Sequence, residues 1–260
     1  MKRVILVFLI ATSLPAMILA QGRGGRGGAP QPPKPAREAA PIDLTGNWVS
    51  VVTEDYRWRM VTPLKGDSAS VPLNAEGLKV VDLWDPAKDE AASLQCKSYG
   101  APAIMRVPGR LRITWTDDST LKVETDAGTQ TRMFHFGAQP PQGAAPSWQG
   151  YSAARWETGP TGRGGIGLGT RTEGAESRSL EVVTTQLRAG YLRKNGVPYS
   201  DKTSVTEYYD RFKEPNGDEW FTVTTIVTDP VYLSIPFVTT TDFKKENDGS
   251  KFSPSACSAR

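Results

Sequence analysis

Glu207 has the best prospect of acid–base chemistry in this chain. It lies between Val205 and Tyr209 in the segment TSVTEYYDRF, and in a strand these three side chains point to one face. If that face is inward, burial raises the pKa of the carboxyl group, which is the usual preparation of a general acid or base. Two other interpretations stay open: an ion pair with an Arg of a neighbouring strand, or the opposite facing, which leaves Glu207 in water. Arg211 shares the face and is a candidate assistant.

His135 is the next catalytic candidate, because the chain has one histidine. Any Ser-His-Asp or Cys-His mechanism would need it as the base. It lies in the segment MFHF, where alternation points it away from Phe134 and Phe136, and no G-x-S-x-G motif accompanies it. The pattern favours an exposed or cavity-lining strand histidine and disfavours a hydrolase triad.

A glycine-rich segment at 162–167, GRGGIG, has the spacing of a dinucleotide-binding fingerprint. That motif functions between a strand and the N-terminus of a helix, whose amides hold the pyrophosphate. Here both flanks have strand patterns, and the stretch 158–179 is rich in Gly, Thr, Ser and Glu. We therefore predict a flexible hairpin loop over 158–179 and no cofactor.

Cys96 and Cys257 are the two cysteines of the chain, and an even number favours one disulfide in an oxidising compartment. The bond would tie the C-terminal segment KFSPSACSAR to the body of the protein, and closing so long a loop contributes about 5 kcal/mol at most. Two free thiols or a metal pair are the alternatives. Because the chain has one His, a Cys/His zinc cluster has too few ligands, and we expect no metal site.

Aromatic residues occur in almost every predicted strand and suggest a site for a small apolar molecule. Trp115, Tyr209 and Trp220 are the candidates for ligand contact. If several such side chains converge inside a closed barrel, they line a pocket for a flat or apolar molecule. The simpler interpretation is that most of them fill the core.

The elements that must position these residues are strands with a period of two. In residues 110–136, RLRITWTDDSTLKVETDAGTQTRMFHF, apolar and polar residues alternate in runs separated by turn residues at 117–119 and 126–128. This pattern predicts an antiparallel meander with one buried face.

The same signature returns near the C-terminus, in SLEVVTTQL, TSVTEYYDRF, EWFTVTTIV and FVTTTDF. Asn216-Gly217, between the second and third of these runs, predicts a tight hairpin turn. With earlier strands expected at 46–53 and 56–62, the chain should have about eight to ten strands, which is typical of a sandwich or barrel.

One short helix is predicted at 74–84, NAEGLKVVDLW, with Asn74 as its N-cap. Its inward residues should be Leu78, Val81 and Trp84. The predicted fold class is therefore all-β, an antiparallel meander that forms a β-barrel, with a β-sandwich as the alternative.

Composition divides the chain into three regions. Residues 1–20 have a basic start, an apolar run and a small residue at Ala20, which predicts a cleaved signal peptide and a periplasmic or extracellular product. An uncleaved anchor would need about 20 apolar residues, and this run is interrupted. Residues 21–41 are rich in Gly, Pro and Arg and predict a disordered linker. Residues 42–260 are expected to form a single β domain.

Charge is close to balance in the predicted domain. The chain has 31 Lys and Arg against 28 Asp and Glu, and six of these bases but one acid precede residue 42. A nucleic-acid site needs a basic excess on one face, so we expect no nucleic-acid partner. We also expect no integral membrane segment after signal removal, because no later run approaches a spanning length. The oligomeric state has no signature in the sequence.

The start of the predicted domain, DLTGNW, resembles the G-x-W opening of lipocalin-like barrels. The resemblance rests on Gly46 and Trp48. It implies an up-and-down barrel in which the Trp packs across the closed end and the interior holds a ligand.

A broader resemblance covers most of residues 44–245. The order SWQGYS, RWE, LEVVTT, NGVPYS and TIVTDP is similar to a large family of exported, uncharacterised bacterial proteins. Members often have His where this chain has Tyr199, so the resemblance implies no acid–base role at that position. The family implies export and organisation but no reaction.

Together these observations favour an exported, non-catalytic protein that binds a small apolar or amphipathic molecule. The first alternative is a barrel-pocket enzyme for proton-transfer chemistry, such as an isomerase, hydratase or cyclase, with Glu207 as acid or base and Arg211 or His135 assisting. It requires Glu207 to be buried beside a cavity. The second alternative is an envelope protein-interaction module, which predicts a solid interior and an exposed apolar patch.

Overall fold

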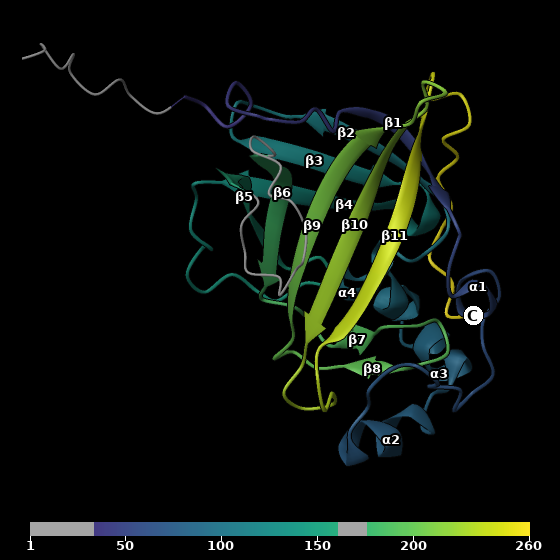
Figure 1. The fold of residues 1–260 in the computed structure, drawn as a ribbon. Coiled ribbons are helices and arrows are strands. Elements are labelled where there is room, and N and C mark those ends of the chain that lie inside the picture. The colour runs from purple at the N-terminus through teal and green to yellow at the C-terminus, as the bar shows by residue number, and fades with distance from the viewer. Residues whose placement is uncertain (1–33, 161–175) are drawn as a thin grey trace, which may run out of the picture. The chain divides into compact units, whose positions relative to one another are not determined.

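The computed structural model of the chain describes residues 34–160 and 176–260. Strands dominate this part of the chain (Figure 1). They are β1 (Gly46–Val51), β2 (Arg110–Trp115), β3 (Thr120–Thr125), β4 (Gln130–Phe136), β5 (Tyr151–Pro160), β6 (Glu176–Thr185), β7 (Gly190–Tyr191), β8 (Pro198–Tyr199), β9 (Ser204–Lys213), β10 (Glu219–Thr228) and β11 (Phe237–Glu246). The helices are α1 (Tyr56–Arg59), α2 (Ala75–Val81), α3 (Pro86–Ala91) and α4 (Ala101–Ile104), with 3-10 turns η1 (Gln95–Tyr99) and η2 (Ala127–Thr129).

Nine strands close into a barrel in the order β1-β11-β10-β9-β6-β5-β4-β3-β2. β1 closes it, because it pairs with β11 on one side and with β2 on the other. The predicted all-β barrel is therefore confirmed, and closure removes the edge strands that a sandwich would keep. One pair departs from the antiparallel meander: β4 and β5 are parallel, since a long connection joins them in place of a hairpin.

The two ends of the barrel differ. In Figure 1, α2, α3 and the β7-β8 sheet gather at one end, which we name the capped end. Residues 34–45 cross the opposite end, the mouth, and we name them the strap. The hairpin predicted at Asn216-Gly217 joins β9 to β10, and Gly217 takes a φ of 91°, which favours glycine.

Two predictions of secondary structure are wrong, one about a strand and one about the number of helices. The strand expected at 56–62 is helix α1 instead, because the chain leaves the sheet after β1 and turns at Asp55, which has a φ of 54°. The number of helices is also larger than one. α1, α3 and α4 are only four to six residues long, too short for apolar periodicity to reveal them.

The helix predicted at 74–84 is present as α2. Asn74 caps it, since its side-chain oxygen accepts hydrogen bonds from the N–H groups of Glu76 and Gly77 at 3.0 Å each. Val81 is buried as expected, but Leu78 is 51% exposed, so its predicted inward facing is wrong. Trp84 lies beyond the helix and is half-buried.

The folded part begins earlier than predicted. Residues 34–41, the end of the predicted disordered linker, form a turn at the mouth. The Arg37 N–H donates to the Asp118 carbonyl at 3.0 Å, and the Trp156 indole N–H donates to the Ala36 carbonyl at 2.7 Å. These bonds order a segment whose composition alone predicts disorder. The predicted signal peptide, 1–20, and the earlier part of the linker lie outside the described residues.

The loop predicted at 158–179 is shorter than expected. β5 and β6 stay paired as far as Pro160 and Glu176, so strands replace both of its ends. The middle, 161–175, which contains the GRGGIG segment, lies outside the described residues.

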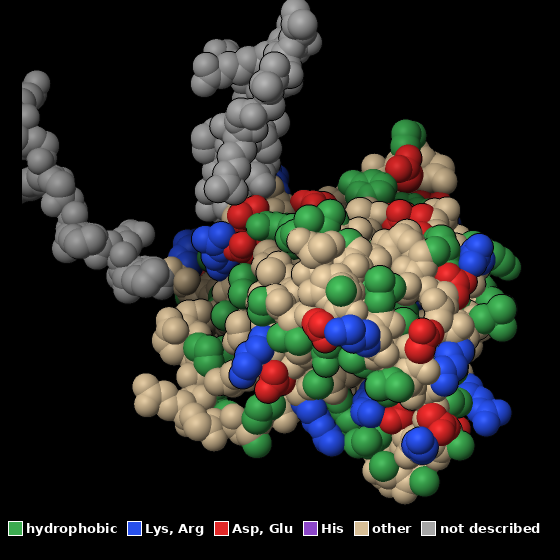
Figure 2. Space-filling model, turned by 90° about the horizontal axis from the view of Figure 1, so that it is seen from below, with side chains coloured by type: hydrophobic (Ala, Val, Ile, Leu, Met, Phe, Trp, Pro, Cys, Tyr) green, Lys and Arg blue, Asp and Glu red, His purple; other side chains and the backbone are tan. Residues whose placement is uncertain are grey.

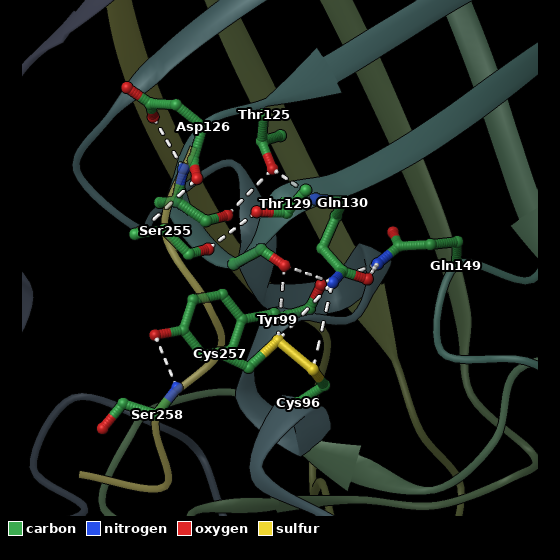
Figure 3. Close-up of a disulfide and its surroundings, with 12 residues drawn as sticks. Cys96, Tyr99, Thr125, Asp126, Thr129, Gln130, Gln149, Ser255, Cys257 and Ser258 are labelled. Carbon is green, nitrogen blue, oxygen red and sulfur yellow. Dashed lines mark hydrogen bonds between the residues drawn. A yellow bond between two sulfur atoms is a disulfide. The ribbon is translucent and has the colours of Figure 1, made fainter. Parts of the chain in front are cut away.

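The predicted disulfide is confirmed. Cys96, in η1, is bonded to Cys257, with Cα atoms 5.1 Å apart and a sequence separation of 161. The tail after β11 lies against the η2 turn beside this bond, where the Ser255 N–H donates to the Asp126 carbonyl at 2.8 Å (Figure 3). A segment without helix or strand is thereby part of the fold.

Candidate functional site

The barrel interior has two apolar clusters with a polar layer between them. The cluster toward the mouth includes Val223, and the cluster toward the capped end includes Val227. Thr225 lies between these two on β10, and its register partner on β9 is Glu207. The polar layer consists of the buried residues Arg132, Ser152, Thr184, Glu207, Thr225, Thr239 and Thr241.

An ion pair occupies the polar layer. Arg132 of β4 and Glu207 of β9 meet in bidentate geometry, with Nη1–Oε1 at 2.9 Å and Nη2–Oε2 at 2.6 Å, and both side chains are fully buried. Thr184 accepts a further hydrogen bond from Arg132 at 3.2 Å. Glu207 thus faces inward, and its partner is an Arg. That Arg does not belong to a neighbouring strand, because β5 and β6 lie between β4 and β9.

The pair shifts the pKa values of the groups around it. Burial by itself lowers the pKa of Arg132, but the Glu207 carboxylate raises it, and the net shift is upward. Burial raises the pKa of the Tyr209 hydroxyl well above its usual value, and the charge of Glu207 adds to this. Arg132 therefore stays protonated and Tyr209 stays neutral at physiological pH. A carboxylate whose two oxygens both accept hydrogen bonds from a guanidinium is a poor general base.

Arg211 lies apart from this pair. It is on the same face of β9 as Glu207 but four residues further along, about 13 Å at strand spacing. Its Nη2 donates to Glu219 at 2.8 Å. Hydrogen bonds from Lys245 and Arg211 lower the pKa of Glu219 to about 2.

His135 also lies elsewhere. Its ring is half-buried and stacks on Tyr151 with ring centres 4.8 Å apart. Its neighbour Phe134 is fully buried, as strand alternation predicts. The structure therefore does not bring the three catalytic candidates into one site.

Aromatic side chains fill the interior toward the mouth. The rings that do so are at most 1% exposed, and neighbouring ring centres are 4.7 to 6.1 Å apart. They are Trp48, Phe134, Tyr209, Phe221 and Phe243. This region is packed core, which is the simpler of the two interpretations of the aromatic residues. Tyr209 belongs to that core.

Trp115 lines an open pocket at the mouth, the mouth pocket. The pocket has a volume of about 450 Å³. Trp115, Leu121 and Trp156 form its barrel side, and strap residues 37 and 40–45 form the other side. Ring packing fixes the two tryptophans, because both contact Phe136, at 5.5 and 5.1 Å between ring centres.

The strap side of the mouth pocket and Trp156 were not predicted as site residues. Their signal in the sequence is weak, because the strap follows a Gly, Pro and Arg-rich stretch and contains few apolar residues besides Ile42 and Leu44. The third predicted ligand residue, Trp220, is half-buried beneath the ammonium group of Lys244, 5.7 Å from its ring centre. It does not line the mouth pocket.

Metal, membrane-spanning and nucleic-acid sites each require a recognisable feature of the chain. Across 34–160 and 176–260, no three His, Cys, Asp or Glu side chains group as a metal site requires. No helix in the described part of the chain is long and apolar enough to cross a membrane. On the face shown in Figure 2, basic and acidic side chains are interspersed, so that face offers no continuous basic surface for nucleic acid.

The mouth pocket and the buried ion pair are the features of the barrel that bear on function. No protein-family model, curated protein or solved structure matches this chain significantly.

Proposed function

We propose that this chain is an exported, non-catalytic protein that binds a small amphipathic molecule in the mouth pocket. The mouth pocket is the observation that carries the proposal: two tryptophans and Leu121 form an apolar wall, and the strap side carries one cation, Arg37, and one acid, Asp43. Its volume of about 450 Å³ is within the range of small-molecule sites. A flat ring system would pack on Trp115 and Trp156, with an acidic group toward Arg37.

Two features support export. Residues 1–20 have the pattern of a secretory signal peptide. The Cys96–Cys257 disulfide is of the kind that persists in oxidising compartments.

Binding of anilinonaphthalene sulfonate, an aromatic ring system with one acidic group, tests the proposal. Trp115→Leu removes one aromatic wall and should weaken binding by at least about tenfold, equivalent to about 1.4 kcal/mol. Trp220→Leu is the matched control, because Trp220 is a half-buried tryptophan outside the mouth pocket. It should change the affinity by less than about twofold. Equal losses in the two variants, or undiminished binding by Trp115→Leu, would contradict the proposal.

Native mass spectrometry of the protein purified from its own host would show whether a natural ligand is bound. A stoichiometric small molecule would support the binding function. A clean apo mass would favour the envelope protein-interaction module, for which the filled interior near the mouth is the supporting observation.

The enzyme alternative has less support. It requires Glu207 beside a cavity, whereas Glu207 is bound to Arg132 and does not line the mouth pocket. Arg211 and His135 lie away from it, so these three candidates do not face a common substrate position.

A further inference from the structure

Three buried arginines converge between α1, α4 and β7. Arg59 ends α1, Arg106 follows α4 and Arg193 follows β7, with exposures of 7%, 6% and 4%. The Arg59 Nε donates to the Arg106 carbonyl at 3.0 Å. The Arg193 guanidinium stacks on the ring of Trp58, 4.7 Å from its centre. Segments far apart in the sequence therefore place three cationic groups together.

Most donors of these side chains have no acceptor. Arg106 Nη2 donates to Asp55 at 2.6 Å, and Arg193 Nη2 donates to the Ser70 hydroxyl at 3.0 Å. Among the described residues, no partner exists for Nη1 and Nη2 of Arg59, Nη1 of Arg106, or Nε and Nη1 of Arg193. Buried donors of a charged group are costly to leave unpaired, so the cluster suits an acceptor that residues 34–160 and 176–260 do not supply.

Charge in the cluster is also unbalanced. In the part of the chain that the structure describes, one acid forms an ion pair with any of the three arginines: Asp55, with Arg106. Other acids act on the cluster through their charge without bonding to it: Glu54 and Asp242 act on Arg59, and Asp67, which pairs with Arg57, acts on Arg193. Burial and the charge of Arg106 lower the pKa of Arg193 to about 10, and the same two causes lower the pKa of Arg59. An anion would relieve both the repulsion and the burial cost.

A small pocket opens among these groups, the arginine pocket. It has a volume of about 30 Å³. The three arginines, Trp58, Ser98 and Lys194 line it together with four apolar residues. A pocket of this volume holds a compact polar group and excludes a bulky one. The arginine pocket shares no residue with the mouth pocket.

We propose that the arginine pocket binds a small dianionic oxyanion of the phosphate type, either free or as the head group of a larger molecule. Guanidinium forks donate in pairs to the oxygens of such an anion. The three arginines and Lys194 are four cationic groups, and Asp55 is the one described acid paired with them, so a doubly charged anion matches the unpaired donors better than a singly charged one. The Trp58 ring holds the Arg193 fork at the pocket. This site is independent of ligand binding at the mouth.

Isothermal titration of the full-length protein with inorganic phosphate at constant ionic strength tests the site. Arg193→Met keeps the apolar stem but removes two unpaired donors, and it should weaken phosphate binding by at least about tenfold. Arg57→Met is the matched control. Arg57 stacks on the same Trp58 ring at 4.8 Å, but its side chain is 67% exposed and does not line the arginine pocket. It should change the affinity by less than about twofold.

A second variant covers the case in which Arg193→Met does not fold. Lys194→Gln alters the half-buried ammonium group of the same pocket and should weaken phosphate binding by at least about threefold. Phenyl phosphate that binds as tightly as inorganic phosphate would identify a head-group site, and binding of inorganic phosphate alone would identify a site for the free anion. The proposal is overturned if phosphate does not bind, if acetate binds equally well, or if the folded pocket variants bind phosphate like the wild type.

Discussion

The ion pair of Arg132 and Glu207 shows how two residues stabilise buried charges inside a barrel. The carboxylate is acceptable there because a guanidinium from across the barrel satisfies both of its oxygens. On β9 its same-face neighbours Val205 and Tyr209 belong to the two apolar clusters. The pair therefore links the clusters and is a structural feature of the core.

Substitution of this pair should show that each charge needs the other. Glu207→Gln leaves the buried Arg132 charge uncompensated and should lower the free energy of unfolding by about 3 kcal/mol. The double variant Arg132→Met/Glu207→Leu should recover most of that loss, because apolar side chains can join the clusters. Urea unfolding measures both. A double variant that is as unstable as Glu207→Gln would contradict this account, as would a change in its affinity for anilinonaphthalene sulfonate.

At the scale of elements, two irregular segments complete the barrel. The strap is held across the mouth by two hydrogen bonds of its backbone, from the Arg37 N–H to the Asp118 carbonyl and from the Trp156 indole N–H to the Ala36 carbonyl. The C-terminal tail is held by the disulfide and by hydrogen bonds of Ser255. Neither has a periodic pattern, so each depends on contacts with segments that are distant in the sequence.

The disulfide should contribute measurably to stability. The double variant Cys96→Ser/Cys257→Ser should lower the free energy of unfolding by about 2–4 kcal/mol, because the reduced chain regains the entropy of an open loop of 161 residues. Urea unfolding gives the value, and wild-type protein with a thiol reductant should match the variant. Unchanged unfolding midpoints in both samples would show that the tail is held without the bond.

At the scale of the whole molecule, carboxylates make stability depend on pH. Hydrogen bonds and ion pairs lower the pKa values of six described carboxyl groups, namely Asp67, Asp117, Asp218, Glu219, Asp229 and Asp248. Asp229 is the most buried, at 2% exposure. Burial raises its pKa, but hydrogen bonds from Ser200, Thr203, Val231 and Tyr232 outweigh that effect.

The direction of the pH dependence follows from these shifts. Groups with a lowered pKa in the folded state stabilise the fold above their unfolded pKa, near pH 4, and that contribution is lost as the pH falls toward 2. The urea midpoint should therefore be similar at pH 7 and 5 and clearly lower at pH 3. Asp229→Asn should already be less stable at pH 7, because it loses an acceptor for buried donors. An equal wild-type midpoint at pH 7 and pH 3 would contradict this.

Local patterns were sufficient to predict much of the fold. Alternation in residues 110–136 and after 180 predicted β2, β3, β4, β6, β9, β10 and β11, because side chains in a strand alternate whatever the partner strand is. The sequence predicts the Asn74 helix cap and the Asn-Gly turn because caps and turns depend on adjacent residues. The disulfide followed from counting cysteines.

Only the tertiary structure created the sites. Arg132 meets Glu207 across 75 positions and two intervening strands, so no spacing rule could pair them. Trp115 and Trp156 share a pocket with the strap, and Arg59, Arg106 and Arg193 share another, although each set comes from separate segments. Alternation defines which face of a strand is buried but not what lies opposite, because that depends on strand order and barrel closure.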